Sequence, residues 1–345
     1  MRIWRAFASK RLKTLFKLLA ALPLLLVSAA VTTGCSESAS TETSKPIEQA
    51  ASTDPSSKGL IDDGRINNAN AEPGNWLAYG RDFEEQRFSP LTQINTETVG
   101  RLGLEFEIDL QTRGALEATP IMVDNTLYFT STFSILHAVD ATNGEPLWTY
   151  DPKVPKDYMR RACCGPINRG VAVYEGNVYL GTLDGRLVAV NAETGKQVWE
   201  VNTVIDTERD YSITGAPRVA RGKVYIGNGG AEFGVRGYVT AYDAKTGDQV
   251  WRFFTVPGDP SLPFEHPEME MAAKTWKGGQ WWEVGGGGTV WNSIVYDPDF
   301  NQVYLGVGNG APWTRVIRSP GGGDNLFLTS IVAVDADTGT MNWHY

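Results

Sequence analysis

One phrase of eleven residues recurs four times, and this repeat restricts the fold more strongly than any other feature. Each copy starts with Ala, ends with Trp ten positions later, and carries Asp or Asn and then Gly between them. The copies occupy residues 138–148, 189–199, 241–251 and 333–343. Their starts lie 51, 52 and 92 residues apart, and the last interval fits two units with a degenerate copy near residues 296–301. Such a period is typical of repeat architectures.

The second copy shows how one unit is expected to fold. The alternating run 186–190 predicts a strand, residues 191–195 provide Asn, Thr and Gly for a tight turn, and the return strand begins before Trp199. Residues 170–182 predict another strand pair upstream, with Gly176 and Asn177 at its turn. Four strands per unit predict an all-β fold made of β-propeller blades. We interpret the repeated Trp as the residue that packs each blade against the next.

The first 35 residues have the pattern of an export signal. Six Lys and Arg residues precede an apolar run of 14 residues, 18–31, which is shorter than the roughly 20 that a membrane-spanning helix needs. Gly34-Cys35 resembles a lipoprotein cleavage site, although Thr32 stands where such signals usually carry Leu. We predict a signal peptide of lipoprotein type over residues 1–35 and a periplasmic protein, anchored through a lipidated Cys35 or, alternatively, cleaved and released.

Residues 36–71 are rich in small and polar side chains, which predicts a disordered tether. Removing the leader takes six of the 31 basic residues and none of the 40 acidic ones, which leaves 25 against 40 and a net charge of −15. This charge argues against a nucleic-acid partner, which calls for a basic face. An acidic surface can steer a basic protein partner, but ordinary solubility is the simpler interpretation.

Two adjacent cysteines interrupt the repeat pattern. Besides Cys35, Cys163 and Cys164 are the only cysteines in the sequence. In an oxidising compartment, pairing with each other is the simplest expectation, and two free thiols are the alternative. A ring closed by adjacent cysteines is strained, and such strain tends to occur at functional sites.

The segments around these cysteines resemble the quinoprotein alcohol and methanol dehydrogenases, which use pyrroloquinoline quinone (PQQ) and close a propeller of eight blades. Ala-Cys-Cys-Gly-Pro-Ile-Asn-Arg at 162–169 resembles their vicinal-disulfide segment, and Gly-Gly-Ala-Glu-Phe-Gly at 229–234 resembles their metal-ligand turn. Further matches follow in the family's order. The resemblance implies cofactor contacts from Glu117, Cys163, Cys164, Arg169, Thr214, Gly230, Ala231, Thr289 and Trp291, and metal ligands from Glu232 and Asn309.

The chemistry of these residue types is consistent with that assignment. A flat quinone needs apolar walls on both faces, which the cysteine pair and Trp291 can supply. Arg169 offers a planar fork for carboxylates or carbonyls, and Glu232 and Asn309 carry the hard oxygen ligands that Ca²⁺ prefers. A lanthanide ion is the alternative metal. Each residue alone is more often solvated or structural, so the prediction depends on the whole set.

The resemblance also implies parts that we expect beyond Tyr345. In the family the catalytic base is an Asp located shortly after the position of Trp343, so no catalytic residue is assigned here. We expect residues 72–345 to be an incomplete propeller of four to five blades that is inactive by itself. The implied activity of the whole protein is oxidation of alcohols to aldehydes, with electrons passed to a cytochrome c or a quinone.

One alternative belongs to a different class of function. A propeller lipoprotein that scaffolds outer-membrane protein assembly would share the repeats and the lipid anchor without any enzymatic activity. It would not require Cys163, Cys164, Glu232, Trp291 and Asn309, so these residues favour the dehydrogenase. The insertion 265–282, rich in Trp, Glu and Met, predicts either a lid over the pocket or a cover for the edge of one blade.

Overall fold

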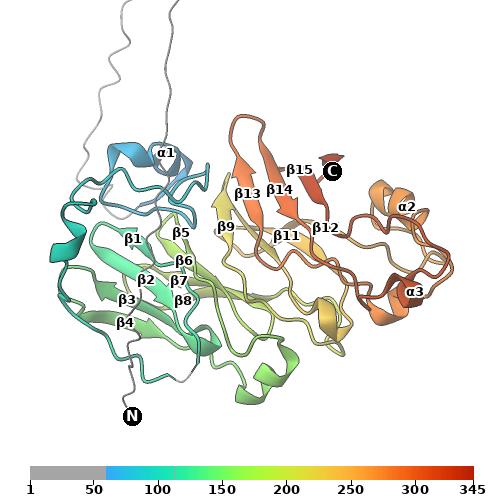
Figure 1. Ribbon diagram of the computed structural model, residues 1–345, viewed down its shortest axis with the longest axis horizontal. Helices are drawn as coiled ribbons and strands as arrows, with labels where there is room; N and C mark the ends of the chain where they lie inside the picture. Colours follow the sequence, from blue (N-terminus) through green and yellow to red (C-terminus); the bar gives the residue numbers. More distant parts are fainter. Residues whose placement is uncertain (1–59, 113) are drawn as a thin grey trace, which may run out of the picture. The chain divides into compact units, whose positions relative to one another are not determined.

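Four antiparallel sheets of four strands each form the described part of the protein. The computed structural model describes residues 60–112 and 114–345. In every sheet the strands lie side by side in chain order (Figure 1). The first sheet contains β1 (Ile121–Val123), β2 (Thr126–Thr130), β3 (Leu136–Asp140) and β4 (Pro146–Tyr150); the second β5 (Ala172–Tyr174), β6 (Asn177–Gly181), β7 (Arg186–Asn191) and β8 (Gln197–Asn202); the third β9 (Arg218–Ala220), β10 (Lys223–Gly227), β11 (Tyr238–Asp243) and β12 (Gln249–Phe254); the fourth β13 (Ile294–Asp297), β14 (Gln302–Gly306), β15 (Ile331–Asp335) and β16 (Met341–His344).

Helices are short and lie outside the sheets. The α-helices are α1 (Asp63–Asn67), α2 (Pro267–Ala273) and α3 (Arg315–Arg318), and the 3₁₀ turns are η2 (Ala69–Ala71), η3 (Val99–Arg101), η4 (Thr132–Ser134), η5 (Lys156–Arg161), η6 (Ala231–Phe233) and η7 (Trp281–Val284). Within these described residues, no helix has the length and apolar character needed to cross a bilayer. The prediction of an all-β fold with four-stranded blades is therefore confirmed, with four blades in the described residues.

The repeated phrase builds the outer strand pair of every sheet. Its first Ala pairs with its Trp, as Ala189 does with Trp199, and the register shifts directly after that pair in all four sheets. Inner strands are buried on both faces, as Val178, Tyr179 and Leu180 of β6 show with no exposed surface. The outer strand β8 alternates between exposed and half-buried positions, whereas β12 also buries Trp251 and Phe253.

The repeated Trp residues dock each blade on the next, as predicted. Trp148 donates its indole N–H to the carbonyl oxygen of Ala192 at 3.1 Å. Its ring lies so close to Gly195 that a Cβ there would meet it at 2.7 Å, and the backbone φ of Gly195 is +67°. The same carbonyl contact, also at 3.1 Å, recurs from Trp199 and from Trp251. Only glycine therefore fits this turn comfortably.

Removing the most buried docking ring should destabilise the protein strongly. Trp251 is 7% exposed, packs against the tilted ring of Tyr225 and donates to the carbonyl of Ala336 at 3.1 Å. We expect Trp251→Ala to lower the free energy of unfolding by about 3–5 kcal/mol. Trp251→Phe keeps an aromatic ring but removes the hydrogen bond, and should cost on the order of 1 kcal/mol from that bond. Urea unfolding measures both, and equal losses would contradict the docking role.

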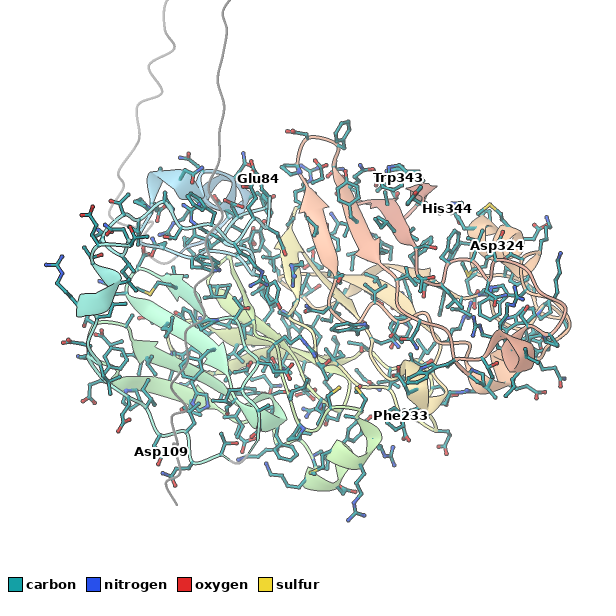
Figure 2. The ribbon with its side chains drawn as sticks, in the orientation of Figure 1. Glu84, Asp109, Phe233, Asp324, Trp343 and His344 are labelled. Atoms are coloured by element: carbon teal, nitrogen blue, oxygen red, sulfur yellow. The ribbon has the colours of Figure 1, made fainter. Side chains whose placement is uncertain are left out.

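Phe106 extends the docking pattern to a segment whose role the sequence did not reveal. Leu102–Leu110 alternates apolar and acidic side chains after Gly103, yet it forms no regular strand in the structure. Phe106 packs on Gly144, where a Cβ would meet its ring at 2.5 Å, in the way that Trp148 packs on Gly195. At the other end of the sheets, Trp343 packs on Tyr304 and is 42% exposed (Figure 2).

The long interval between the third and fourth phrases has a different cause from the one predicted. Residues 296–301 cover the end of β13 and the turn to β14, within the fourth sheet, so the expected degenerate unit is wrong. The extra length comes from two excursions, which carry α2 with η7 and α3. The excursions are joined to each other, because Trp276 donates its indole N–H to the carbonyl of Leu326 at 2.7 Å.

Residues 60–71 fold against the sheets, so the predicted tether is wrong for this part of the chain. Ile61 and Ile66 have no exposed surface, and Asp62 caps α1 by accepting a hydrogen bond from the Arg65 backbone N–H at 2.8 Å. Tyr174 of β5 donates to Asp63 at 2.9 Å. Two isoleucines are thus enough to dock a polar segment on a preformed surface. The signal peptide, Cys35 and the rest of the tether lie outside the described residues.

Candidate cofactor site

Ten of the eleven predicted site residues line one cavity of about 240 Å³. The lining consists of Cys163, Cys164, Arg169, Ser212, Thr214, Gly229, Gly230, Ala231, Glu232, Thr289, Trp291 and Asn309. Glu117 is the predicted residue that does not line it. The cavity therefore brings together side chains that are up to 146 positions apart, from Cys163 to Asn309.

Strand direction explains why these residues meet. Thr214, Thr289 and Trp291 precede the first strand of a sheet, as do the cysteines and Arg169, whereas the 229–232 segment and Asn309 follow the second strand. In an antiparallel pair the start of one strand lies beside the end of its neighbour. All these loops consequently emerge at one end of the second, third and fourth sheets, whose first strands contact one another from β5 to β9 and from β9 to β13.

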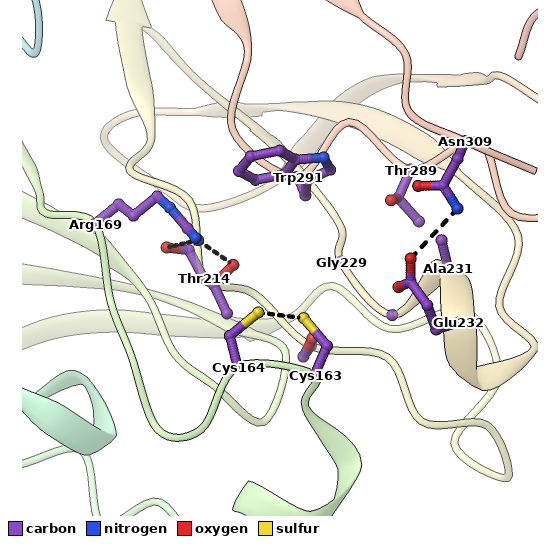
Figure 3. Close-up of a pocket in the computed structure, with 12 residues that line it drawn as sticks. Cys163, Cys164, Arg169, Thr214, Gly229, Ala231, Glu232, Thr289, Trp291 and Asn309 are labelled. Carbon is purple, nitrogen blue, oxygen red and sulfur yellow. Dashed lines mark hydrogen bonds between the residues drawn. The ribbon is translucent and has the colours of Figure 1, made fainter. Parts of the chain in front are cut away.

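Two walls face each other across the cavity. The indole of Trp291 lies opposite the side chains of Cys163 and Cys164 (Figure 3). Trp291 is 43% exposed and lines the cavity. An exposed indole facing a compact pair of sulfur atoms leaves a slot that suits a flat ring.

Arg169 forms one edge of this slot. Its Nη1 donates to the Thr214 hydroxyl at 2.7 Å, and its Cζ lies 4.9 Å from the centre of the Trp291 ring. Its Nη2 lies 3.1 Å from a carboxylate oxygen of Glu117. Glu117 thus contacts Arg169 and orients the guanidinium group, where the sequence predicted a direct contact with the cofactor. An oriented fork of this kind suits a carboxylate-bearing ligand.

Glu232 and Asn309 form the opposite edge. The Asn309 amide donates to a Glu232 carboxylate oxygen at 3.3 Å, and both side chains border the cavity (Figure 3). Within the described residues no group of three or more His, Cys, Asp or Glu side chains gathers as a metal site. The pair fits an oxygen-ligated ion such as Ca²⁺, but supplies only part of the six to eight oxygens it takes.

The two cysteines adjoin one another in the cavity wall. Their sulfur atoms lie 2.6 Å apart, and the structure records both as free thiols, so the disulfide stays a prediction. Partial burial, followed by the adjacent Cys164 thiol, raises the pKa of the Cys163 thiol to about 11. A reduced Cys163 would therefore carry little thiolate at neutral pH and would react slowly.

We expect alkylation to reveal a disulfide between Cys163 and Cys164. The protein should be unfolded in denaturant before treatment with iodoacetamide, because the raised pKa of Cys163 would otherwise imitate protection by a disulfide. Mass spectrometry should then find no label on either residue without reductant and a label on both after reduction. Two labels without reductant would show that these cysteines are free thiols.

Sequence reasoning missed Ser212 and Gly229 in the cavity lining. The backbone N–H of Gly229 donates to the carbonyl of Ser212 at 2.7 Å, and this bridge joins the loops that carry Thr214 and Glu232. The contact joins backbone atoms only, so the side chains of Ser212 and Gly229 did not indicate it in the sequence. None of the lining residues comes from the 265–282 insertion. There Trp276 and Trp281 are each only 4% exposed and pack in a separate small core, which favours the edge cover over the lid.

Comparisons with known proteins agree with the geometry. Residues 76–345 match the family described as PQQ glucose/ethanol/alcohol dehydrogenase, β-propeller domain. The structure of a quinohemoprotein alcohol dehydrogenase of Pseudomonas putida is 56% identical, with a TM-score of 0.81 over 84% of this chain and 42% of that one. A europium-containing methanol dehydrogenase is 34% identical, with a TM-score of 0.73 over 82% of this chain and 50% of its own.

A curated relative from Thauera butanivorans carries the name 1-butanol dehydrogenase (cytochrome c). It is 50% identical over 280 residues, which are 80% of this chain and 40% of the relative. The chain spans about 40% of the length of the curated relatives it matches. Because the family match covers most of the sequence and all four sheets, the chain belongs to the PQQ-dependent alcohol dehydrogenase family and forms part of its β-propeller domain.

Proposed function

We propose that the cavity binds PQQ and that the full-length protein oxidises alcohols to aldehydes. The observation that carries this proposal is the convergence of ten predicted residues on one cavity, with Trp291 facing Cys163 and Cys164. The names of the relatives, which include alcohol, methanol and 1-butanol dehydrogenases, support an alcohol as the substrate. No observation favours the scaffolding alternative.

The residues of the chain have separate tasks in this proposal. Trp291 and the cysteine pair hold a flat ring from its two faces, and Arg169, oriented by Glu117, pairs with its carboxylates. Thr214 and Thr289 add hydroxyls at the rim of the cavity. PQQ, when bound, accepts the two electrons that the alcohol loses on becoming an aldehyde.

Glu232 and Asn309 would hold a metal ion at the edge of the slot. Their oxygens favour Ca²⁺, and the europium-containing methanol dehydrogenase supports a lanthanide as the alternative. Such an ion acts as a Lewis acid that makes a quinone carbonyl more susceptible to attack. Stripping the metal with EDTA and restoring Ca²⁺ or Eu³⁺ separately would distinguish the two ions by the activity that each recovers.

Asn309 also borders a second cavity of about 430 Å³. This cavity is lined by Gly310, Trp313, Arg318, Leu328 and Thr329 as well. Trp313 is 73% exposed and supplies apolar surface beside the proposed metal edge. We propose that the carbon chain of the alcohol lies on this side, against the exposed Trp313 ring.

Further parts of the proposal concern location and electron transfer. We propose export to the periplasm through the signal over residues 1–35, with lipidation at Cys35, and transfer of electrons to a cytochrome c or a membrane quinone. The word cytochrome c in the name of the Thauera relative supports the first acceptor. Mass spectrometry of the mature N-terminus would show a lipid-modified Cys35, and an unmodified N-terminus would contradict the anchor.

A dye-reduction assay tests the proposed activity. The full-length protein is incubated with a short primary alcohol and an artificial electron acceptor, with PQQ and Ca²⁺ added together, singly or not at all. We expect reduction of the dye only when both are present, and no reduction of NAD⁺ in its place. Turnover that is indifferent to PQQ would rule out the proposed site.

A further inference from the structure

The turn that carries Glu232 is bounded by two glycines. It is the single 3₁₀ turn η6, flanked by Gly230 with φ +101° and Gly234 with φ +74°. Both values lie in the left-handed region that favours glycine, and glycine adds little stiffness to the backbone around it. Among the described residues, the Glu232 carboxylate accepts a side-chain hydrogen bond only from Asn309, at 3.3 Å. Something outside the turn must therefore hold Glu232 at a defined place in the cavity wall.

Two neighbouring residues, Arg209 and Asp210, contact the turn at both of its flanking glycines. Arg209 donates a short hydrogen bond from Nη1 to the carbonyl oxygen of Gly234. The carbonyl oxygen of Asp210 lies against Gly230, where a Cβ would meet it at 2.5 Å. Arg209 and Asp210 thus brace the turn from its first glycine to its last.

The guanidinium group of Arg209 makes two further hydrogen bonds. Its Nη2 donates to the carbonyl oxygen of Glu283 at 2.9 Å, and its Nε donates to Asp206 at 3.0 Å. The planar guanidinium group therefore binds two carbonyl groups from separate loops, while the Asp206 carboxylate fixes its Nε atom. A single ammonium group cannot reproduce this geometry.

The same segment is also anchored to the loop that carries the cysteine pair. Tyr158 of η5, which precedes the cysteine pair, donates its hydroxyl to the carbonyl of Tyr211 at 2.6 Å. Arg161 lies 3.4 Å from the carboxylate of Asp210. The segment from Arg209 to Tyr211 therefore spans the distance between the loop of the cysteines and the turn of Glu232.

We propose that Arg209 is a positioning residue that holds Glu232 in place for metal binding. Arg209 does not line the cavity and acts through the Glu232 turn, which it fixes relative to the cysteine wall. The proposal rests on the proposed function, because it takes Glu232 as a metal ligand. Groups that orient a metal ligand typically contribute about 10–100-fold to metal affinity.

The test compares metal affinity in four proteins saturated with PQQ. They are the wild type, Arg209→Lys, Glu232→Gln and the control Arg186→Lys. Arg186 bonds in a similar way, through Nε and both Nη atoms, to Asp184, Glu200 and the carbonyl of Pro152. None of these partners belongs to the Glu232 turn, and Arg186, like Arg209, does not line the cavity. Tb³⁺ luminescence excited through tryptophan, with Ca²⁺ as competitor, reports affinity, and hydrogen exchange of peptide 228–236 reports order in the turn.

We expect Arg209→Lys to weaken Ca²⁺ binding by about tenfold or more and to speed exchange in that peptide. Arg186→Lys should leave both quantities unchanged even if it lowers the melting temperature. Wild-type affinity and wild-type exchange in Arg209→Lys, with binding lost in Glu232→Gln, would overturn the role of Arg209. Equal affinity in the wild type and Glu232→Gln would instead overturn the metal site itself.

Discussion

Glu232→Gln in the full-length protein should lower kcat/KM for a primary alcohol by about 100-fold or more at low Ca²⁺. The substitution removes the one charged oxygen ligand that the described residues place beside Asn309. Because glutamine keeps the size and one amide oxygen, the protein should fold and still bind the ion weakly. Millimolar Ca²⁺ should therefore restore part of the activity, as measured by dye reduction over a range of Ca²⁺ concentrations.

Glu208→Gln is the matched control for this result. Glu208 is an exposed carboxylate on the 206–212 segment and does not line the cavity. We expect its removal to leave both activity and the Ca²⁺ requirement unchanged. A loss of activity in Glu232→Gln that no concentration of Ca²⁺ relieves would show that Glu232 has another task.

Trp291→Ala should weaken retention of PQQ by about 10–100-fold, because stacking of a flat heteroaromatic ring on an aromatic side chain contributes roughly 1–3 kcal/mol. The substitution also removes the ring that lies 4.9 Å from the Arg169 guanidinium group. Titration of the apoprotein with PQQ, followed by the absorbance that remains after gel filtration, measures this loss.

The response to Ca²⁺ separates the two substitutions. Excess Ca²⁺ should not rescue Trp291→Ala, because the missing wall is apolar and binds no ion. Trp291→Phe should recover part of the retention, since it restores a smaller ring at the same place. Equal rescue of Trp291→Ala and Glu232→Gln by Ca²⁺ would mean that one of the two residues is misassigned.

The sequence predicted the strands well because their signals are local. Alternating side chains at 186–190 and the turn ending at Gly195 mark a hairpin whatever surrounds them, and the Trp at its end marks a packing position. Features that depend on contact between distant segments left no such signal. Phe106 packs on Gly144, and the isoleucines of residues 60–71 pack against the sheets. Both contacts join segments that are separated in the sequence.

The same distinction applies to the candidate site. Side chains with distinctive chemistry, such as Cys163, Glu232 and Trp291, were recognisable in the sequence and line one cavity. Glu117 does not line the cavity and contacts Arg169 at 3.1 Å, so its predicted contact with the cofactor stays a prediction. Arg209 was missed entirely. Two of its three partners are the backbone carbonyls of Gly234 and Glu283, and backbone carbonyls leave no mark in the sequence.

A crystal structure of the full-length protein soaked with PQQ and Ca²⁺ would test the central claim most directly. We predict density for a flat ring between the Trp291 indole and the side chains of Cys163 and Cys164, with its carboxylates toward Arg169. An ion should contact Glu232 and Asn309 at the edge of the same ring. Density for PQQ elsewhere in the protein, with this cavity holding only solvent, would contradict the assignment.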